Sequence, residues 1–259
     1  MVAQPDRQRQ WPEPVQVRQQ IVTAIIVDGG FYRKRARALF GEKEAADRAD
    51  ELLTYCRRHT RQARASLHRI YYYDCPPSEK VIFHPLTRRQ VNLRRSSEYR
   101  WMQDFLLALT KKRKVALRRG EELETQNGYT LKSEPLKKLC AGAISIEDLQ
   151  ESDFSLDITQ KGVDMRIGLD IASLAQSGVV NQIIMISGDS DFVPAAKHAR
   201  RCGIDFILDP MWARISDSLS EHVDGVFQAV LRPPDNEGDP LYWDVDSKGT
   251  ESRDFGPDL

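Results

Sequence analysis

The chain lacks several features that would place it in a specialised class of protein. It has only four cysteines in 259 residues and no CxxC pair, which excludes a zinc knuckle or a thioredoxin-type motif. No run approaches the ~18 consecutive apolar residues that a membrane span needs. The first 20 residues contain Arg, Gln and Pro but no apolar core, which argues against a secretory signal. We therefore expect free thiols, no membrane partner and a cytoplasmic location.

Net charge is also absent, but the zero balance conceals an asymmetry. Residues 1–120 carry 26 Lys and Arg against 12 Asp and Glu, and residues 121–259 carry 12 against 26. Basic surface attracts polyanions, whereas clustered carboxylates attract metal cations. The distribution suggests that one fold performs two jobs, one in each half of the chain.

Four short apolar runs are typical of buried parallel strands. They cover residues 21–27, 67–73, 182–186 and 205–208. Helical patterns lie between them, at residues 33–40, 42–63, 163–176 and 192–202. Strands that alternate with helices of this length predict an α/β fold with a doubly wound, mostly parallel sheet.

The remaining segments predict one domain with a tail at each end. Residues 1–20 and 233–259 are interpreted as tails, and the second, with eight acidic and two basic residues, is expected to be disordered. Residues 21–232 form the domain. Within it, the interval 85–158 departs from the strand–helix rhythm, and we interpret it as an inserted basic segment on the sheet. It contains a predicted helix through residue 110 and an edge strand at residues 114–118.

Aspartates follow the predicted strands at the places where ligands usually bind. Asp28 comes directly after the first strand, and Asp189 and Asp191 follow the third. The carboxyl ends of parallel strands share one edge, so these side chains converge if the two strands are neighbours. Asp164 opens the helix that follows Lys161-Gly162. Asp170 lies about 240° further around that helix, so we expect Asp164 rather than Asp170 to face the same point.

Converging carboxylates repel each other unless a cation neutralises them. Oxygen ligands without His or Cys favour Mg²⁺ or Mn²⁺ over zinc. Such ions hold phosphoryl oxygens and activate a bound water, and so support phosphodiester hydrolysis. The structural alternative is that Asp28 precedes an ordinary glycine turn and that Ser190 or Asp191 caps a helix.

Four motifs carry a resemblance to a known family. They are IIVDG at residues 25–29, KGVDMRIGLD at 161–170, SGDSDFVP at 187–194 and SEHVD at 220–224. At these residues the sequence resembles the NYN domain family of the LabA-like, DUF88 type, within the PIN-like nuclease superfamily. The order and separation of the motifs match as well, from residue 21 to about residue 230.

The resemblance implies a Rossmann-like, three-layer α/β/α fold and a metal-dependent ribonuclease activity. It also implies that four acids serve catalysis and metal binding, namely Asp28, Asp164, Asp189 and Asp191. Asp170 matches a second family acid on the same helix as Asp164, and Asp224 matches an acid late in the family sequence; both are further candidate metal ligands. Some members of the wider family have Asn where this chain has Phe31, which weakens the implied activity. Other members of the LabA-like type are associated with regulation.

A basic segment at residues 88–119 completes the functional interpretation. It holds eleven Lys and Arg against two acids, with Tyr99, Trp101 and Phe105 interleaved. Basic side chains contact phosphates and aromatic rings stack on unpaired bases, although a solvated helix face explains the charges too. The residues expected to bind RNA are Arg33, Lys34, Arg94, Arg95, Arg118 and Arg119.

The sequence therefore predicts a ribonuclease that cleaves single-stranded RNA with a water activated by Mg²⁺ or Mn²⁺. The alternative is a non-catalytic regulatory module that binds RNA or a nucleotide. A phosphatase-like hydrolase is disfavoured because no DxD motif follows the first strand. A homo-oligomer is compatible with the sequence.

Overall fold

A computed structural model describes residues 20–120, 128–156 and 162–230. At its centre is a six-stranded, wholly parallel sheet with the order β10-β9-β8-β1-β2-β5. The strands are β1 (Val22–Asp28), β2 (Ser66–Asp74), β5 (Val115–Arg119), β8 (Gln182–Ile186), β9 (Asp205–Asp209) and β10 (Gly225–Val226). The predicted α/β class is confirmed, and the four predicted strands correspond to β1, β2, β8 and β9.

The central strands are buried on both faces. On β1, Ile25 and Val27 belong to one apolar cluster, while Ala24 and Ile26 belong to the other. All four side chains have no exposed surface. This burial on two sides explains why the strand sequence is continuously apolar instead of alternating.

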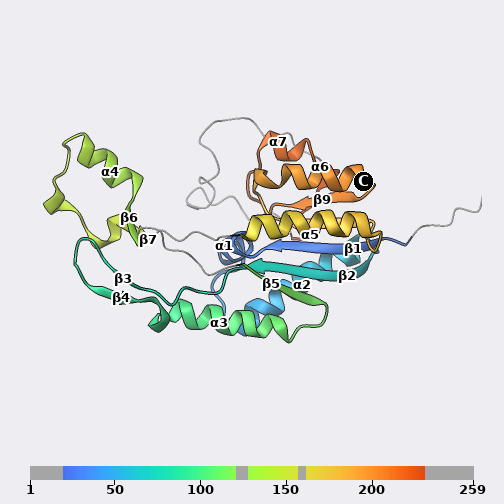
Figure 1. Cartoon of the computed structure of the whole chain (residues 1–259), viewed down its shortest axis with the longest axis horizontal. Helices are drawn as coiled ribbons and strands as arrows, with labels where there is room; N and C mark the ends of the chain where they lie inside the picture. The colour runs from blue at the N-terminus through green and yellow to red at the C-terminus, as the bar shows by residue number, and fades with distance from the viewer. Residues whose placement is uncertain (1–19, 121–127, 157–161, 231–259) are drawn as a thin grey trace, which may run out of the picture.

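Helices cover both faces of the sheet and produce three layers (Figure 1). One face packs against α1 (Gly29–Phe40), α2 (Ala45–Gln62) and α3 (Ser97–Thr110). The other packs against α5 (Val163–Ser177), α6 (Val193–Arg201) and α7 (Asp217–Ser220). Among the described residues, no helix has the length and apolar character needed to cross a membrane.

The strand order reverses between β1 and β8. From β1 the chain proceeds outward to β2 and β5, and it later returns to β8 on the other side of β1 before reaching β9 and β10. In sheets of this kind the crevice at the carboxyl ends of the two central strands is the usual place for a ligand. The fold therefore places Asp28 and the loop after β8 at that crevice.

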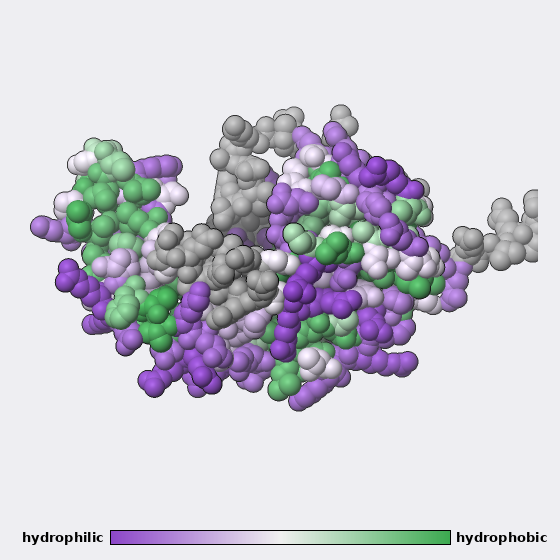
Figure 2. Space-filling view, in the orientation of Figure 1, coloured by the Kyte–Doolittle hydropathy of each residue, from purple (hydrophilic) through white to green (hydrophobic). Residues whose placement is uncertain are grey.

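A smaller unit, here called the arm, projects from the carboxyl edge of the sheet (Figure 1, left). It consists of two antiparallel strand pairs, β3–β4 and β6–β7, with the helix α4. The His84 ring centroid lies 4.6 Å from that of Tyr129 and 5.2 Å from that of Phe154, which joins the two pairs. Figure 2 shows apolar surface over this arm. Its elements are β3 (Val81–Phe83), β4 (Gln90–Asn92), β6 (Tyr129–Leu131), α4 (Ser133–Cys140) and β7 (Phe154–Leu156).

The interval 85–158 is not one continuous insertion. Its helix α3 packs on the main sheet, and β5 pairs with β2 as the edge strand expected at residues 114–118. An edge strand of a parallel sheet is only partly buried, so its sequence alternates between apolar and polar residues. For this reason β5 is interpreted from the sequence as part of an insertion, although it belongs to the main sheet. Among the described residues of this interval, the arm segments are the part that departs from the sheet. The predicted tails at 1–20 and 233–259 lie outside the described residues, apart from Gln20.

Candidate active site

Asp28 ends β1 and begins α1. Its backbone is extended, and its Oδ1 accepts a hydrogen bond from the Phe31 amide at 3.1 Å, so it is the N-cap of the helix. The Ser187 hydroxyl, from the loop after β8, donates to Asp28 Oδ2 at 3.3 Å. Helix α1 therefore begins at Gly29 and not at residue 33 as the sequence suggested. The two hydrogen bonds orient a half-buried carboxylate at the crevice between the central strands.

Gly29 is required by a close approach. A Cβ at this position would lie 2.4 Å from the Tyr73 carbonyl oxygen and 2.6 Å from Asp74 Oδ2. Asp74, at the end of β2, is fully buried, and Arg33 Nε and Nη2 donate to its two oxygens at 2.9 and 3.0 Å. The absence of a side chain at Gly29 thus brings a second carboxylate, with its arginine, beside Asp28.

The loop after β8 places two further carboxylates. Asp189 donates its amide hydrogen to Ser187 Oγ at 3.2 Å, and its own Oδ1 accepts from the Asp191 amide at 2.9 Å. The short 3₁₀ turn η4 (Ser190–Phe192) begins there and leads into α6. Both carboxylates are exposed. Ser187 therefore links Asp28 to this loop through one hydroxyl group.

Asp164 enters the site from the first turn of α5. The preceding Gly162 has a positive φ of 77° and offers no side chain as a cap. Burial raises the pKa of Asp164, and the charges of Asp189 and Asp191 raise it further. Asp164 and Asp191 also line the same groove, so the start of α5 and the loop after β8 lie side by side.

Electrostatic repulsion connects the four acids. Burial raises the pKa of Asp28 from 3.8 to about 6, and the charges of Asp74 and Asp164 contribute to this rise against the opposing effect of the Phe31 amide. Within the described ranges, no basic side chain forms an ion pair with Asp28, Asp164, Asp189 or Asp191. These carboxylates are therefore mutually repelling and not neutralised.

The donor set fits a hard divalent cation, since all its ligand atoms are carboxylate or hydroxyl oxygens. The side chains are not gathered around a common centre as they stand. In the described part of the chain, no three His, Cys, Asp or Glu side chains are arranged to hold a metal ion. The four acids match a metal site in chemistry and in electrostatic need, but not in preformed geometry.

Asp170 does not join these acids. Its carboxylate accepts from the Tyr73 hydroxyl at 2.7 Å and forms an ion pair with Arg118 Nε at 3.0 Å. The Arg118 guanidinium also lies over the Tyr71 ring, 5.4 Å from its centroid. The angular separation from Asp164 along α5 thus turns Asp170 toward β2 and β5.

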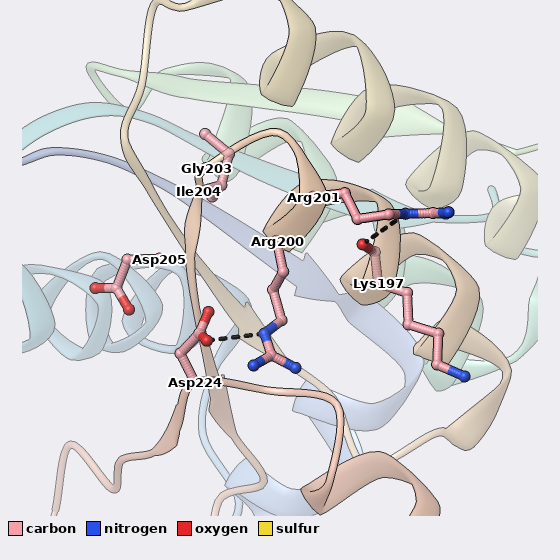
Figure 3. Close-up of a pocket in the computed structure, with 7 residues that line it drawn as sticks. All are labelled: Lys197, Arg200, Arg201, Gly203, Ile204, Asp205 and Asp224. Carbon is pink, nitrogen blue, oxygen red and sulfur yellow. Dashed lines mark hydrogen bonds and ion pairs between the residues drawn. The ribbon is translucent and has the colours of Figure 1, made fainter.

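Asp224 lies far from the expected site. Its amide donates to the Phe206 carbonyl at the start of β9, and its carboxylate binds Arg200 Nε and the Phe206 amide, each at 2.8 Å. It lines a pocket of about 830 Å³ at the amino end of the strands (Figure 3). Asp224 directly precedes β10, which runs parallel to β9, so it lies at the amino end of the strands and not at the carboxyl end where Asp28 lies. The expectation of Asp224 as a metal ligand is therefore not met.

The predicted RNA-binding residues fall into two groups. Arg33 and Arg118 are held by Asp74 and Asp170. Lys34, Arg94, Arg95 and Arg119 have exposed side chains on α1, on the 3₁₀ turn η1 (Leu93–Arg95) before α3, and at the end of β5. Arg94 has only a loose pair with Glu79 at 3.6 Å.

Sequence reasoning missed a buried polar group at the end of β9. Asp209 is fully buried and accepts from the Tyr55 hydroxyl at 2.6 Å, with His59 Nε2 at 2.7 Å. The signal was available, since β1, β2 and β9 each end in aspartate at Asp28, Asp74 and Asp209. The strand predicted at residues 205–208 ended one residue before Asp209, so this aspartate was not recognised.

Comparisons with known proteins place the chain in a family. No curated protein matches its sequence. A structure of a protein of unknown function, VPA0982 from Vibrio parahaemolyticus RIMD 2210633, is 14% identical with a TM-score of 0.41, covering 82% of this chain and 95% of its own. A structure described as the structural basis of sirtuin substrate affinity is 11% identical with a TM-score of 0.31, covering 81% and 89%.

The family model for the NYN domain matches residues 49–229. That range contains Asp164, Asp189 and Asp191, but it begins after β1 and therefore does not include Asp28. The inclusion of Asp28 among the candidate acids rests on its position in the fold. The match spans well over half of the sequence. The chain therefore belongs to the NYN domain family, which is assigned to the PIN-like nuclease superfamily.

Proposed function

We propose that the chain is a metal-dependent ribonuclease that hydrolyses phosphodiester bonds in single-stranded RNA. The observation that carries this proposal is that Asp28, Asp189 and Asp191 follow the two central strands β1 and β8 and that Asp164 opens helix α5. None of the four has a basic partner among the described residues. Elsewhere on this sheet the buried aspartates have partners. A set of repelling carboxylates at the usual ligand position is better explained by a role in cation binding than by a contribution to stability.

The four carboxylates are proposed to hold Mg²⁺ or Mn²⁺. When bound, such an ion would lower the pKa of a water molecule that it binds and would stabilise negative charge on the phosphate. The hydrogen bonds from the Phe31 amide and the Ser187 hydroxyl keep the Asp28 carboxylate turned toward the crevice. No nucleophilic side chain is needed.

Arg33 is proposed to contact the scissile phosphate. It lies on α1 just after Asp28, and its side chain is 29% exposed although two of its nitrogens bind Asp74. Buried Asp74 fixes the plane of the guanidinium, and a planar arginine recognises phosphate oxygens well. Lys34, Arg94, Arg95 and Arg119 would add contacts to phosphates farther along the strand.

The test is cleavage of a labelled single-stranded RNA by Asp28→Asn and Asp189→Asn in Mg²⁺ or Mn²⁺. Each variant should lose cleavage by at least about a hundredfold while its circular dichroism stays unchanged. Asn at position 28 can still accept the Phe31 hydrogen bond, so the helix cap is retained. Asp104→Asn, which removes an exposed charge from α3, is the matched control and should cleave normally. Full activity in both site variants would refute the proposed site.

A second comparison separates the two aspartates of α5. Asp164→Asn should weaken Mn²⁺ binding in calorimetry at least about tenfold, whereas Asp170→Asn should leave it within a few fold because Asp170 is paired with Arg118. Equal losses would mean that the helix presents both carboxylates to the ion.

One observation favours a non-catalytic regulatory role instead. No three acidic side chains in the described segments are arranged around a common point. A protein of that kind would bind RNA with unchanged affinity in the Asp28→Asn variant and would cleave none in any divalent metal. Metal-dependent turnover that disappears with Asp28 therefore distinguishes the two roles.

A further inference from the structure

A groove of about 460 Å³ runs between α5 and α6, and it begins at the candidate active site. Two of the four site acids, Asp164 and Asp191, line it. It continues along α5 to Ala172, eight residues further, which corresponds to about 12 Å of helix. His198 of α6 lines it as well. The groove is thus continuous with the acids and long enough for one nucleotide.

The lining of this groove is mainly apolar. Met165, Phe192 and Pro194 contribute to its walls, and its lining contains no Lys or Arg. Met165 is 74% exposed, and its neighbour on the next turn, Leu169, is 65% exposed. Figure 2 shows apolar surface interrupting the hydrophilic surface on this side of the main domain. Such a surface does not suit a phosphate chain, but it suits the flat face of a base.

Gly168 keeps the groove open. It lies in the middle of α5, and a Cβ built on it would meet no atom within 4 Å. Glycine inside a helix lowers its stability relative to alanine, and here no neighbouring atom requires it. The backbone is helical, so no positive φ requires it either. A side chain at this position would extend into the groove, which gives the glycine a reason outside the packing of the fold.

We propose that the groove receives one unstacked base of the RNA strand, next to the phosphate held at the acids. This inference rests on the function proposed above. Small-molecule sites are typically concave and apolar, with a few polar groups that fix orientation. The Met165 thioether and the Pro194 ring provide surface for the face of a base, and thioethers pack well on aromatic rings. The His198 imidazole is the polar group at the far end.

The test combines affinity with a map of contacts, both independent of turnover. The probe is a single-stranded oligouridine that carries 4-thiouridine, bound to the full chain with Asp28→Asn so that it is not cut. Ultraviolet crosslinks identified by mass spectrometry should fall on peptides of α5 and α6. Gly168→Phe should remove these crosslinks and weaken binding about tenfold, the scale of one lost base contact.

Three variants make the result specific. Ser173→Phe places the same ring on the exposed side of α5, outside the groove, and should bind RNA as the parent does. Gly168→Ala should raise the melting temperature, and it should weaken binding less than Gly168→Phe does because its methyl group fills less of the groove. Met165→Ala shortens one wall at an exposed position, so its fold is safe even if Gly168→Phe unfolds, and it should weaken binding about threefold.

The outcomes separate this inference from the proposed function. Cleavage by the wild type with unchanged binding in Gly168→Phe and Met165→Ala overturns only the groove. Groove crosslinks without any metal-dependent cleavage support the groove and refute the nuclease. If the chain neither binds nor cleaves RNA, both the groove and the proposed nuclease function are refuted. A dimer that Gly168→Phe dissociates in ultracentrifugation, with RNA affinity unchanged, would assign the groove to a second copy and overturn the inference.

Discussion

The sheet and the elements beside it carry two sets of aspartates that differ in their partners. Those on its flanks are paired, each with a basic or hydroxyl group, and they are Asp74 with Arg33, Asp170 with Arg118, Asp209 with Tyr55 and His59, and Asp224 with Arg200. Those at the switch point are Asp28, Asp164, Asp189 and Asp191, which have no ion pair in the described residues. The first set stabilises the fold, whereas the second set consists of the acids that we propose bind the metal ion.

The difference has a physical basis. A buried carboxylate costs free energy unless hydrogen bonds or opposite charges compensate it. On the flanks the compensation is present in the folded chain. At the switch point burial raises the pKa of Asp28 to about 6, so the metal-free protein retains an electrostatic cost there. Cost without compensation is expected at functional sites.

Asp209 should give the largest change in stability. It is fully buried and binds Tyr55, His59 and the Met211 amide. Asp209→Ala leaves those groups without their acceptor and should lower the free energy of unfolding by about 3–5 kcal/mol in urea denaturation. Asp191→Ala, at an exposed site acid, should change it by no more than about 0.5 kcal/mol. Similar losses in both variants would remove the distinction between the two sets.

Arg33→Met should have the next largest effect on stability. It removes the ion pair with buried Asp74 and should cost about 2–3 kcal/mol at neutral pH, a value reduced from that of a fully buried pair because Arg33 is partly exposed. The cost should shrink at acid pH as Asp74 becomes protonated. Arg33→Met combined with Asp74→Asn should recover most of it. No recovery in a thermal melt would indicate that the arginine acts through other contacts.

Asp28→Asn should act in the opposite direction and stabilise the metal-free protein. The folded pKa of Asp28 is raised from 3.8 to about 6, so its protonated form is the one the fold favours. Its contribution to stability is present below pH 4 and is lost as the pH rises to about 6. Relative to wild type, the variant should therefore gain about 1–3 kcal/mol at pH 7 and nothing at pH 4.

Mn²⁺ provides the control for this prediction. Saturating Mn²⁺ should raise the melting temperature of the wild type more than that of Asp28→Asn, because a cation removes the repulsion that the substitution removes. A variant that is less stable than wild type at pH 7 without metal would contradict the assignment of Asp28 to the unpaired set.

Most of the fold could be predicted from the sequence, because a buried parallel strand is continuously apolar and helices end at glycines. The predictions of β8 and of the end of α1 at Gly41 are confirmed. The boundaries of the inserted segment could not be predicted, since β5 is half-exposed and resembles a surface strand. The candidate acids could be named from their places after strands and at a helix start. Their partners could not, because Asp170 and Arg118 are 52 residues apart in sequence and meet only through the sheet.

The last and smallest predicted effect applies the same comparison to the basic side chains. Arg118 and Arg119 are neighbours at the end of β5, but only Arg118 is held by a carboxylate. If the chain binds RNA through phosphates, each contact on a single strand contributes about 0.7 to the slope of log K against log salt. Arg119→Ala should therefore lower the slope by about 0.7 in filter-binding titrations with Asp28→Asn. Arg118→Ala should leave the slope nearly unchanged, because its charge is already committed to Asp170, and should instead lower the melting temperature slightly. Equal changes in slope would mean that RNA displaces Asp170 from Arg118, and the paired set would then include a member that the substrate can recruit.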